Sequence, residues 1–141
     1  MIRPALPSDA DQVATLFAQF DHPTDAASLP DRLARFTADR GRTAMVATIG
    51  TAVVGVATAH VYVTLHNDAP AVMLTALVVR DTDRGRGAGR RLVDAISDWA
   101  RQQGAARLVV TTALRRAGAH AFYERLGFEQ TGRRYQRLTI I

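Results

Sequence analysis

The residues with the clearest chemical potential are three alternating glycines and four arginines in the segment 84–91. A long apolar run, 71–79, precedes them and a helical pattern, 90–103, follows, so a strand should enter a glycine-rich turn that opens into a helix. The first N–H groups of a helix lack intrahelical partners, the helix dipole favours negative charge there, and glycines let a phosphate approach the main chain closely. This arrangement predicts a site for a phosphate-bearing ligand.

The segment does not fit the two commonest phosphate-binding sequences. No Gly-Lys-Ser or Gly-Lys-Thr follows it, so it is not a Walker A loop. Gly85 and Gly87 could begin a G-x-G-x-x-G dinucleotide fingerprint, but Arg90 occupies the closing position and the preceding strand is the fourth of the chain rather than the first. Both nucleotide-binding motifs are therefore disfavoured.

Composition restricts the kind of protein that surrounds this segment. The chain has 141 residues, of which 48% are hydrophobic and 22% charged, as expected for one globular domain covering residues 1–141. It has no cysteine, which excludes disulfides, thiolate metal sites and a cysteine nucleophile. Its apolar runs are too short for a membrane span and its first residues do not resemble a signal peptide, so a cytoplasmic location is expected.

The net charge of +5 has an unusual origin, because all 18 basic residues are arginine. Arginine keeps its charge at any working pH and binds phosphate in a bidentate manner. Over the whole chain, an anionic partner and a compositional bias explain the arginines equally well. Within the segment 84–91 the predicted geometry adds to the charge and favours an anionic ligand.

The elements that must position this segment follow from periodicity and turn residues. The expected helices are 9–20, 29–39, 90–103 and 117–125. The expected strands are 2–4, 43–49, 52–65, 71–79, 107–112, one beginning at Phe128, and 133–140. Ser8 is predicted to cap the first helix, with Asp11 three residues later. The order β-α-α-β-β-β-α-β-α-β-β predicts an α/β fold with a mixed, mostly antiparallel sheet and helices on both faces.

Two sequence signatures resemble those of one enzyme family. Arg84-x-x-Gly87-x-Gly89, preceded by Leu77-Val78-Val79 and followed by a helix, resembles the acyl-CoA signature of the GNAT superfamily of N-acyltransferases. The run 119–128 is similar to the second signature of that family, and the β-α-α opening also matches. The resemblance covers essentially the whole chain. It implies a GNAT-like fold and an N-acetyltransferase that uses acetyl-CoA as co-substrate and needs no metal.

The resemblance also implies how the coenzyme is held. Main-chain N–H groups of 84–90 would bind its pyrophosphate, and the side chain of Arg84 would buttress the loop or pair with phosphate. Arg116 stands where relatives often have Asn against the pantetheine arm, and could reach a phosphate or be solvated. The coenzyme-binding residues expected from the resemblance are Leu77, Val78, Val79, Arg84, Gly85, Arg86, Gly87, Ala88, Gly89, Arg90, Arg116 and Tyr123.

The pantetheine arm is expected along the strand before the loop. By the resemblance, it would pair like an added strand with the backbone of Leu77 and Val79, while their side chains are core. A β-bulge in that strand, placed at 75–76, would splay it from 107–112 and open the slot for the arm.

Acetyl transfer needs a neutral amine, a stabilised oxyanion and a proton for the leaving thiolate. The resemblance assigns the oxyanion to the backbone N–H of Leu77 and the proton to the phenol of Tyr123. Simple packing beside Phe122 is the alternative explanation of that tyrosine. Many relatives carry Glu or His where this chain has Met73 and Thr75. We therefore expect proton removal through water held by Thr75, or an amine that arrives neutral.

The acceptor should bind near the opening helices, residues 17–36, and the hairpin 60–70. Phe17, Phe20, His22 and Phe36 are candidate pocket residues, although core packing explains the phenylalanines more simply. His60, His66 and Asp68 are remote candidates for the base.

Four functions remain as hypotheses. A small-molecule N-acetyltransferase comes first, followed by a peptide or protein N-acetyltransferase and by an acyl-CoA sensor without turnover. A nucleic-acid-binding module, suggested by the Arg-Gly repeat, lacks the interleaved aromatic residues of a stacking surface. The expected partners are acetyl-CoA and an amine, without nucleic acid or membrane, in a monomer or a homodimer.

Overall fold

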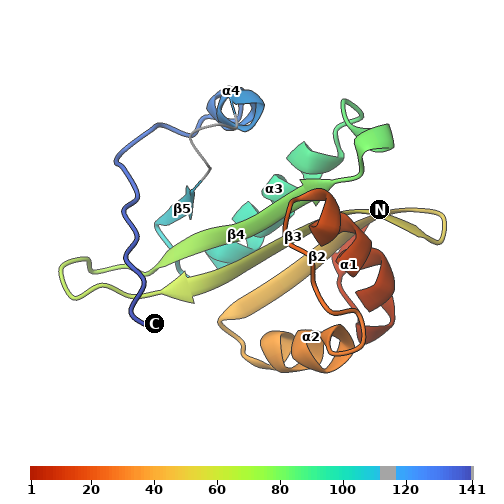
Figure 1. Ribbon diagram of the computed structural model, residues 1–141. Coiled ribbons are helices and arrows are strands. Elements are labelled where there is room, and N and C mark those ends of the chain that lie inside the picture. Colours follow the sequence, from red (N-terminus) through yellow and green to blue (C-terminus); the bar gives the residue numbers. More distant parts are fainter. Residues whose placement is uncertain (112–116, 141) are drawn as a thin grey trace. The chain divides into compact units, whose positions relative to one another are not determined.

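The computed structural model describes residues 1–111 and 117–140 of the chain (Figure 1). The chain forms two compact units, Met1–Val110 and Thr111–Ile141. The elements of the first unit are β1 (Ile2–Pro4), the 3₁₀ turn η1 (Pro7–Asp9), α1 (Ala10–Gln19), α2 (Leu29–Ala38), β2 (Arg42–Ile49), β3 (Ala52–Tyr62), β4 (Ala71–Val79), the 3₁₀ turn η2 (Asp81–Asp83), α3 (Ala88–Gln102) and β5 (Arg107–Val110). The second unit contains α4 (Ala117–Arg125). In the described part of the chain, no helix has the length and apolar character needed to cross a membrane.

The first unit is built on one five-stranded sheet with the order β1-β2-β3-β4-β5. Strands β1 to β4 pair antiparallel, and β5 joins β4 in parallel, which makes the sheet mixed as predicted. β2 and β3 form a hairpin through Gly50, whose φ of 59° is the left-handed value that a tight turn needs. The α/β fold class and its mostly antiparallel sheet are confirmed.

Helices cover both faces of this sheet, as expected. Val46, Val56 and Val78 share one buried cluster with residues of α1 and α2. Successive residues of a strand point to opposite faces, so Gly55 belongs to the other face. A Cβ atom placed on Gly55 would lie 3.0 Å from Cδ1 of Leu92, which shows how closely α3 approaches there. Figure 1 shows α1 in front of the sheet and α3 behind it.

The start of α1 differs from the prediction, because Asp9 rather than Ser8 is the helix cap. Pro7 opens the short turn η1, and the Asp9 carboxylate accepts the Leu6 N–H at 2.7 Å. The Arg3 guanidinium donates two further bonds to it, at 2.8 and 2.9 Å. These bonds hold the pKa of the buried Asp9 below its ordinary value, with the Arg3 hydrogen bond as the largest cause.

The second unit confirms the predicted helix at 117–125. Gly127, with a φ of 89°, ends it, and the N–H of Phe128 reaches back to the carbonyl of Tyr123 at 3.0 Å. The strands expected at Phe128 and at 133–140 are not formed, since residues 128–140 have no regular secondary structure. A β-like pattern becomes a strand only where a neighbour completes its ladder, and none of the described ladders includes this segment.

Candidate active site

The glycine segment forms the predicted strand–turn–helix junction. Gly85 and Gly87 have φ values of 81° and 85°, in the left-handed region that favours glycine. Gly87 is the N-cap of α3, and its carbonyl accepts the Arg91 N–H at 3.0 Å. The N–H groups of the first helical turn therefore have no intrahelical acceptor, and glycine offers no side chain to cap them. The main chain here has the geometry of an anion site.

Three side-chain contacts stiffen the turn before the glycines. The Arg80 Nε donates to the buried Asp83 carboxylate at 2.6 Å, and the Thr82 hydroxyl donates to it at 3.1 Å. The Arg80 hydrogen bond is the main reason that the pKa of Asp83 lies below its ordinary value. Arg84 pairs with Asp81 at 2.9 Å, with both side chains 64% exposed. Of the two roles expected for Arg84, the structure shows the contact that buttresses the turn.

The other arginines of the loop surround it with positive charge. Arg86 and Arg90 are exposed, and neither forms an ion pair with any residue that the structure describes. Arg91 lies near the loop backbone, with one terminal nitrogen 3.5 Å from the Arg86 carbonyl. Arg86 and Arg90 are therefore available to a phosphate without breaking a salt bridge.

A β-bulge interrupts β4 where the sequence predicted one. Thr58 of β3 faces Ala76, whereas the next residue, Ala59, faces Leu74. Thr75 is therefore the extra residue, and its hydroxyl lies 2.7 Å from that of Thr58. The bulge predicted at 75–76 is confirmed.

Beyond the bulge, one edge of β4 has no partner strand among the residues that the structure describes. β5 pairs with β4 only from Ala71 to Leu74. The Arg80 N–H binds the Val54 carbonyl at 2.7 Å, and hydrogen-bonded pairs alternate along an antiparallel ladder. Leu77 and Val79 must therefore direct their N–H and C=O groups away from β3, toward the side on which β5 has ended. These are the two residues predicted to carry the pantetheine arm.

Gln19, which sequence analysis did not identify, lies at this open edge of β4. The Gln19 amide, at the end of α1, donates to the Val79 carbonyl at 3.0 Å and accepts the Asp81 N–H at 3.2 Å. It thus makes the two hydrogen bonds, one donated and one accepted, that a peptide group of a neighbouring strand would make with the end of β4. No local pattern marks this residue, because a glutamine at the end of an amphipathic helix is usually solvated.

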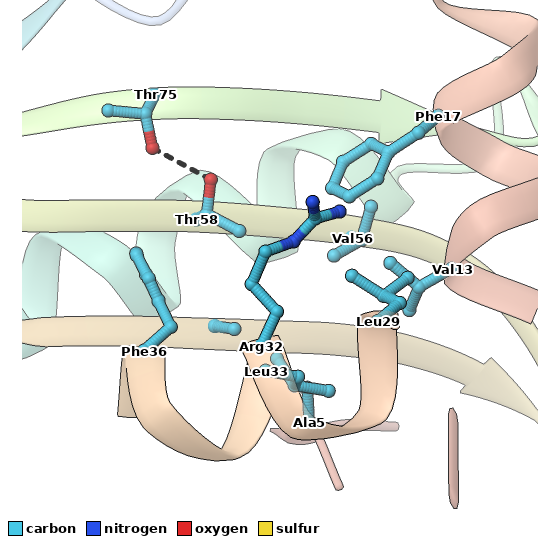
Figure 2. A pocket seen from close by; sticks show the side chains of 11 residues that line it. Ala5, Val13, Phe17, Leu29, Arg32, Leu33, Phe36, Val56, Thr58 and Thr75 are labelled. Carbon is cyan, nitrogen blue, oxygen red and sulfur yellow. Dashed lines mark hydrogen bonds between the residues drawn. The ribbon is translucent and has the colours of Figure 1, made fainter. Parts of the chain in front are cut away.

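A cavity of about 240 Å³ lies between α1, α2 and the sheet (Figure 2). Its lining residues are Ala5, Val13, Phe17, Leu29, Arg32, Leu33, Phe36, Ala44, Val56, Thr58 and Thr75. Phe17 and Phe36 are thus placed as predicted. Phe20 and His22 are not among the lining residues, and their rings instead face each other with centroids 5.2 Å apart.

The Arg32 side chain extends from α2 into this cavity. Figure 2 shows its guanidinium directed toward the space between Phe17 and the paired Thr58 and Thr75 hydroxyls. Sequence reasoning missed this residue, since one arginine among 18 carries no distinguishing signal. Its position in the cavity depends on the tertiary packing of α2 against the sheet.

Tyr123 occupies an aromatic environment within the second unit. Its ring meets those of Phe122 and Phe128 edge-on, with centroids 5.3 and 5.4 Å away. Burial raises the pKa of Tyr123 to about 12, so the phenol keeps its proton at neutral pH. The packing expected as an alternative is therefore present, and it is compatible with a proton donor. Arg116, also expected at the coenzyme, lies outside the described residues.

The strand register brings a histidine next to Met73, one of the two positions at which many relatives carry Glu or His. His60 of β3 is the direct cross-strand partner of Met73. Side chains in such a pair stand close together on one face of the sheet. From the sequence, His60 was expected to be only a remote candidate for the base. The register of a hairpin cannot be read from residue types when a bulge shifts it.

The sequence matches the family model described as Acetyltransferase (GNAT) family over residues 10–128. The mouse protein described as "Probable N-acetyltransferase family 8 member 5" is 34% identical over 70 residues, which make up 50% of this chain and only 30% of the mouse protein.

Solved structures share the fold at lower sequence identity. A structure from Bacillus halodurans, described as a transcriptional regulator, is 23% identical, covers 98% of both chains and has a TM-score of 0.88. An aminoglycoside N-acetyltransferase in complex with the bisubstrate analogue CoA-S-monomethyl-acetylneamine is 22% identical, with 100% of this chain and 98% of that chain covered and a TM-score of 0.85. These two likenesses show the fold. Because the family match runs from the first residue of α1 through α4, the chain belongs to the acetyltransferase (GNAT) family.

Proposed function

We propose that the protein transfers an acetyl group from acetyl-CoA to the primary amine of a small molecule, by direct attack in a ternary complex. The observation that carries this proposal is the cavity under α1 and α2. Thr75 lines it, and the same residue is the bulge after which the backbone edge of Leu77 and Val79 becomes unpaired. An acceptor in the cavity would thus lie beside the strand that receives the acetyl-bearing arm.

On the donor side, the main chain supplies the recognition. The pyrophosphate would bind the N–H groups of the glycine loop and first turn of α3, with Arg86 and Arg90 adding charge. The pantetheine amides would pair with Leu77 and Val79 in the manner of an added strand. A carbonyl oxygen has two lone pairs, so Val79 can accept from the arm while it keeps its bond to Gln19.

In the reaction, the amine nitrogen attacks the thioester carbon and forms a tetrahedral intermediate. The Leu77 N–H would stabilise its oxyanion, and collapse would expel the coenzyme A thiolate and leave an amide. The amine loses one proton, through water held by Thr75 or toward His60, and the thiolate gains one from Tyr123. This role requires both units to act as one domain, which the family match across residues 10–128 supports.

The size of the cavity favours a small acceptor over a peptide. Pockets for drug-sized ligands measure about 300–1,000 Å³, and this one, at about 240 Å³, lies below that range. Helices α1 and α2 and the sheet all contribute to its lining. The cysteine-free sequence also favours a cytoplasmic location for the enzyme.

The test is release of free coenzyme A thiol across amines, polyamines, amino acids, aminoglycosides and peptides. We expect turnover with small amines and little with peptides. Acetyl-CoA alone should raise the melting temperature, because it binds the folded state. Activity confined to peptides would replace the small-molecule proposal with a protein N-acetyltransferase. A bound acetyl-CoA without turnover on any amine would indicate a sensor.

A further inference from the structure

We infer that Arg32 selects acceptors that carry a carboxylate, so that the substrate class is an amine with an apolar body and an acid group, as in an apolar amino acid. The inference rests on the proposed function, because it assigns the acceptor of the same cavity. It also goes beyond that function, since a small amine does not need an anionic group.

The position of Arg32 is unusual for a surface arginine. It lies in the first turn of α2, where its N–H binds the carbonyl of the N-cap residue Ser28 at 3.2 Å. The positive end of the helix dipole disfavours a cation at this position. Among the described residues, no carboxylate lies within ion-pair distance of Arg32 to compensate. Arg32 thus places an unfavourable charge at the start of α2, and no described ion pair compensates for it. Residues that break a local rule in this way are typical of functional sites.

The surroundings of the guanidinium complete the site. Eight of the eleven lining residues are apolar, two are the hydrogen-bonded threonines, and Arg32 supplies the only charge among them. Arg32 is exposed as a residue, and Figure 2 shows its guanidinium directed toward the space between Phe17 and the two threonines. An anion bound beside apolar walls is screened less than on an open surface, and a guanidinium grips a carboxylate with two parallel bonds.

The same lining disfavours polycationic acceptors. No Asp or Glu is among the residues that line the cavity, so a polyamine or aminoglycoside would meet a positive charge without a counter-ion. Asp25, in the loop before α2, is engaged locally, because its carboxylate accepts the Ala27 N–H at 3.1 Å. The cavity therefore fits an apolar group against its walls, a carboxylate at Arg32 and an amine near Thr75.

The experiment compares matched acceptors in three proteins. Leucine, phenylalanine and methionine are each paired with the amine that lacks their carboxylate, and kcat/KM is measured by thiol release in wild type, Arg32→Gln and Arg35→Gln. Arg35 is an exposed arginine of the same helix that does not line the cavity, so it is the matched control. Amino acids and simple amines differ in basicity, but this difference cancels when one pair is compared between proteins.

We expect the preference for the amino acid over its amine to fall about 10- to 100-fold in Arg32→Gln, mainly through KM, and to stay unchanged in Arg35→Gln. An unchanged preference in Arg32→Gln overturns the inference, as does a wild type that acetylates none of the amino acids. The melting temperature with acetyl-CoA distinguishes a failure of the Arg32 inference from a failure of the proposed function. If it rises and amines without a carboxylate are acetylated, only the inference about Arg32 fails. If acetyl-CoA gives no shift and no amine is acetylated, the proposed function fails too.

Discussion

The two sides of the candidate site are made of different parts of the chain. The donor side consists mainly of main-chain atoms, namely the helix start after Gly87 and the open edge of β4 at Leu77 and Val79. The acceptor cavity consists of side chains drawn from both opening helices and three strands of the sheet. Coenzyme recognition should therefore tolerate most side-chain changes, whereas acceptor recognition should respond to them.

The largest effect should come from the one donor-side group that must be a side chain. Tyr123→Phe removes the proposed proton donor, so kcat should fall about 100- to 10,000-fold while the dissociation constant for acetyl-CoA stays nearly constant. The exposed Tyr135→Phe is the control. Thiol release and calorimetric binding give the two quantities. A Tyr123→Phe variant with normal kcat would remove the acid role.

The pH profile tests the same residue independently. Burial raises the pKa of Tyr123 to about 12, so its protonated form persists to higher pH than usual. The rate should therefore show no descending limb from this group at pH 10, where an ordinary tyrosine would be half deprotonated. By linkage, the raised pKa also means that the stability gained from the neutral phenol is complete below pH 10 and is lost as pH rises toward 12.

A main-chain site should be destroyed by one badly placed side chain. Gly87→Val forces a β-branched residue into a φ of 85°, and acetyl-CoA binding should weaken about 100-fold. Gly50→Val imposes similar strain at a φ of 59° in the β2–β3 hairpin and should destabilise the protein without weakening binding. Calorimetry of acetyl-CoA binding to both variants tests this difference. Wild-type affinity in Gly87→Val would place the phosphates elsewhere.

On the acceptor side, loss of the Thr75 hydroxyl should lower activity more than loss of the Thr58 hydroxyl. Thr75→Val keeps the shape of the side chain but removes the proposed water contact, so kcat/KM for the amine should fall about 10-fold with unchanged acetyl-CoA affinity. Thr58→Val leaves the Thr75 hydroxyl in place and should have a smaller effect. Equal losses in both variants would show that the pair acts as one structural unit.

The smallest effect is expected from the exposed arginines of the glycine loop. Arg86→Gln removes an exposed charge that pairs with no described carboxylate, so acetyl-CoA binding should weaken only a few-fold, and less at high salt. Binding measured at low and high ionic strength tests this. A loss as large as that of Gly87→Val would mean that side chains, not the backbone, define the donor site.

The donor side was largely predictable because its signals are local. The strand at 71–79, the glycine turn and the following helix are adjacent in sequence, and β4 has the predicted bounds. The conformations required of Gly85 and Gly87 follow from residue type alone. The following helix runs from Ala88 to Gln102 instead of 90–103, and β5 ends at Val110 instead of 112.

The acceptor side was less predictable because its contacts are distant in sequence. Arg32 enters a cavity that is also lined by residues of α1, of three strands and of α2 itself. On the donor side, Gln19 likewise meets Val79 across 60 positions. Such contacts depend on helix packing and on a bulged register, which residue types do not specify. The cap prediction at Ser8 was also wrong, and the Asp9 N-cap forms an ion pair with Arg3 that no local pattern indicates.

The bulge at Thr75 can be viewed as a one-residue insertion into an otherwise regular ladder. Ala59 faces Leu74 and Thr58 faces Ala76, so removal of Thr75 would leave a continuous register in which every remaining side chain keeps its face. The fold therefore does not need this residue. A deletion variant should fold with a melting temperature at or above that of the wild type, and β5 could then continue pairing along β4. Acetyl-CoA should not raise the melting temperature of this variant, because the sheet would keep its topology but lose the open edge that receives the coenzyme.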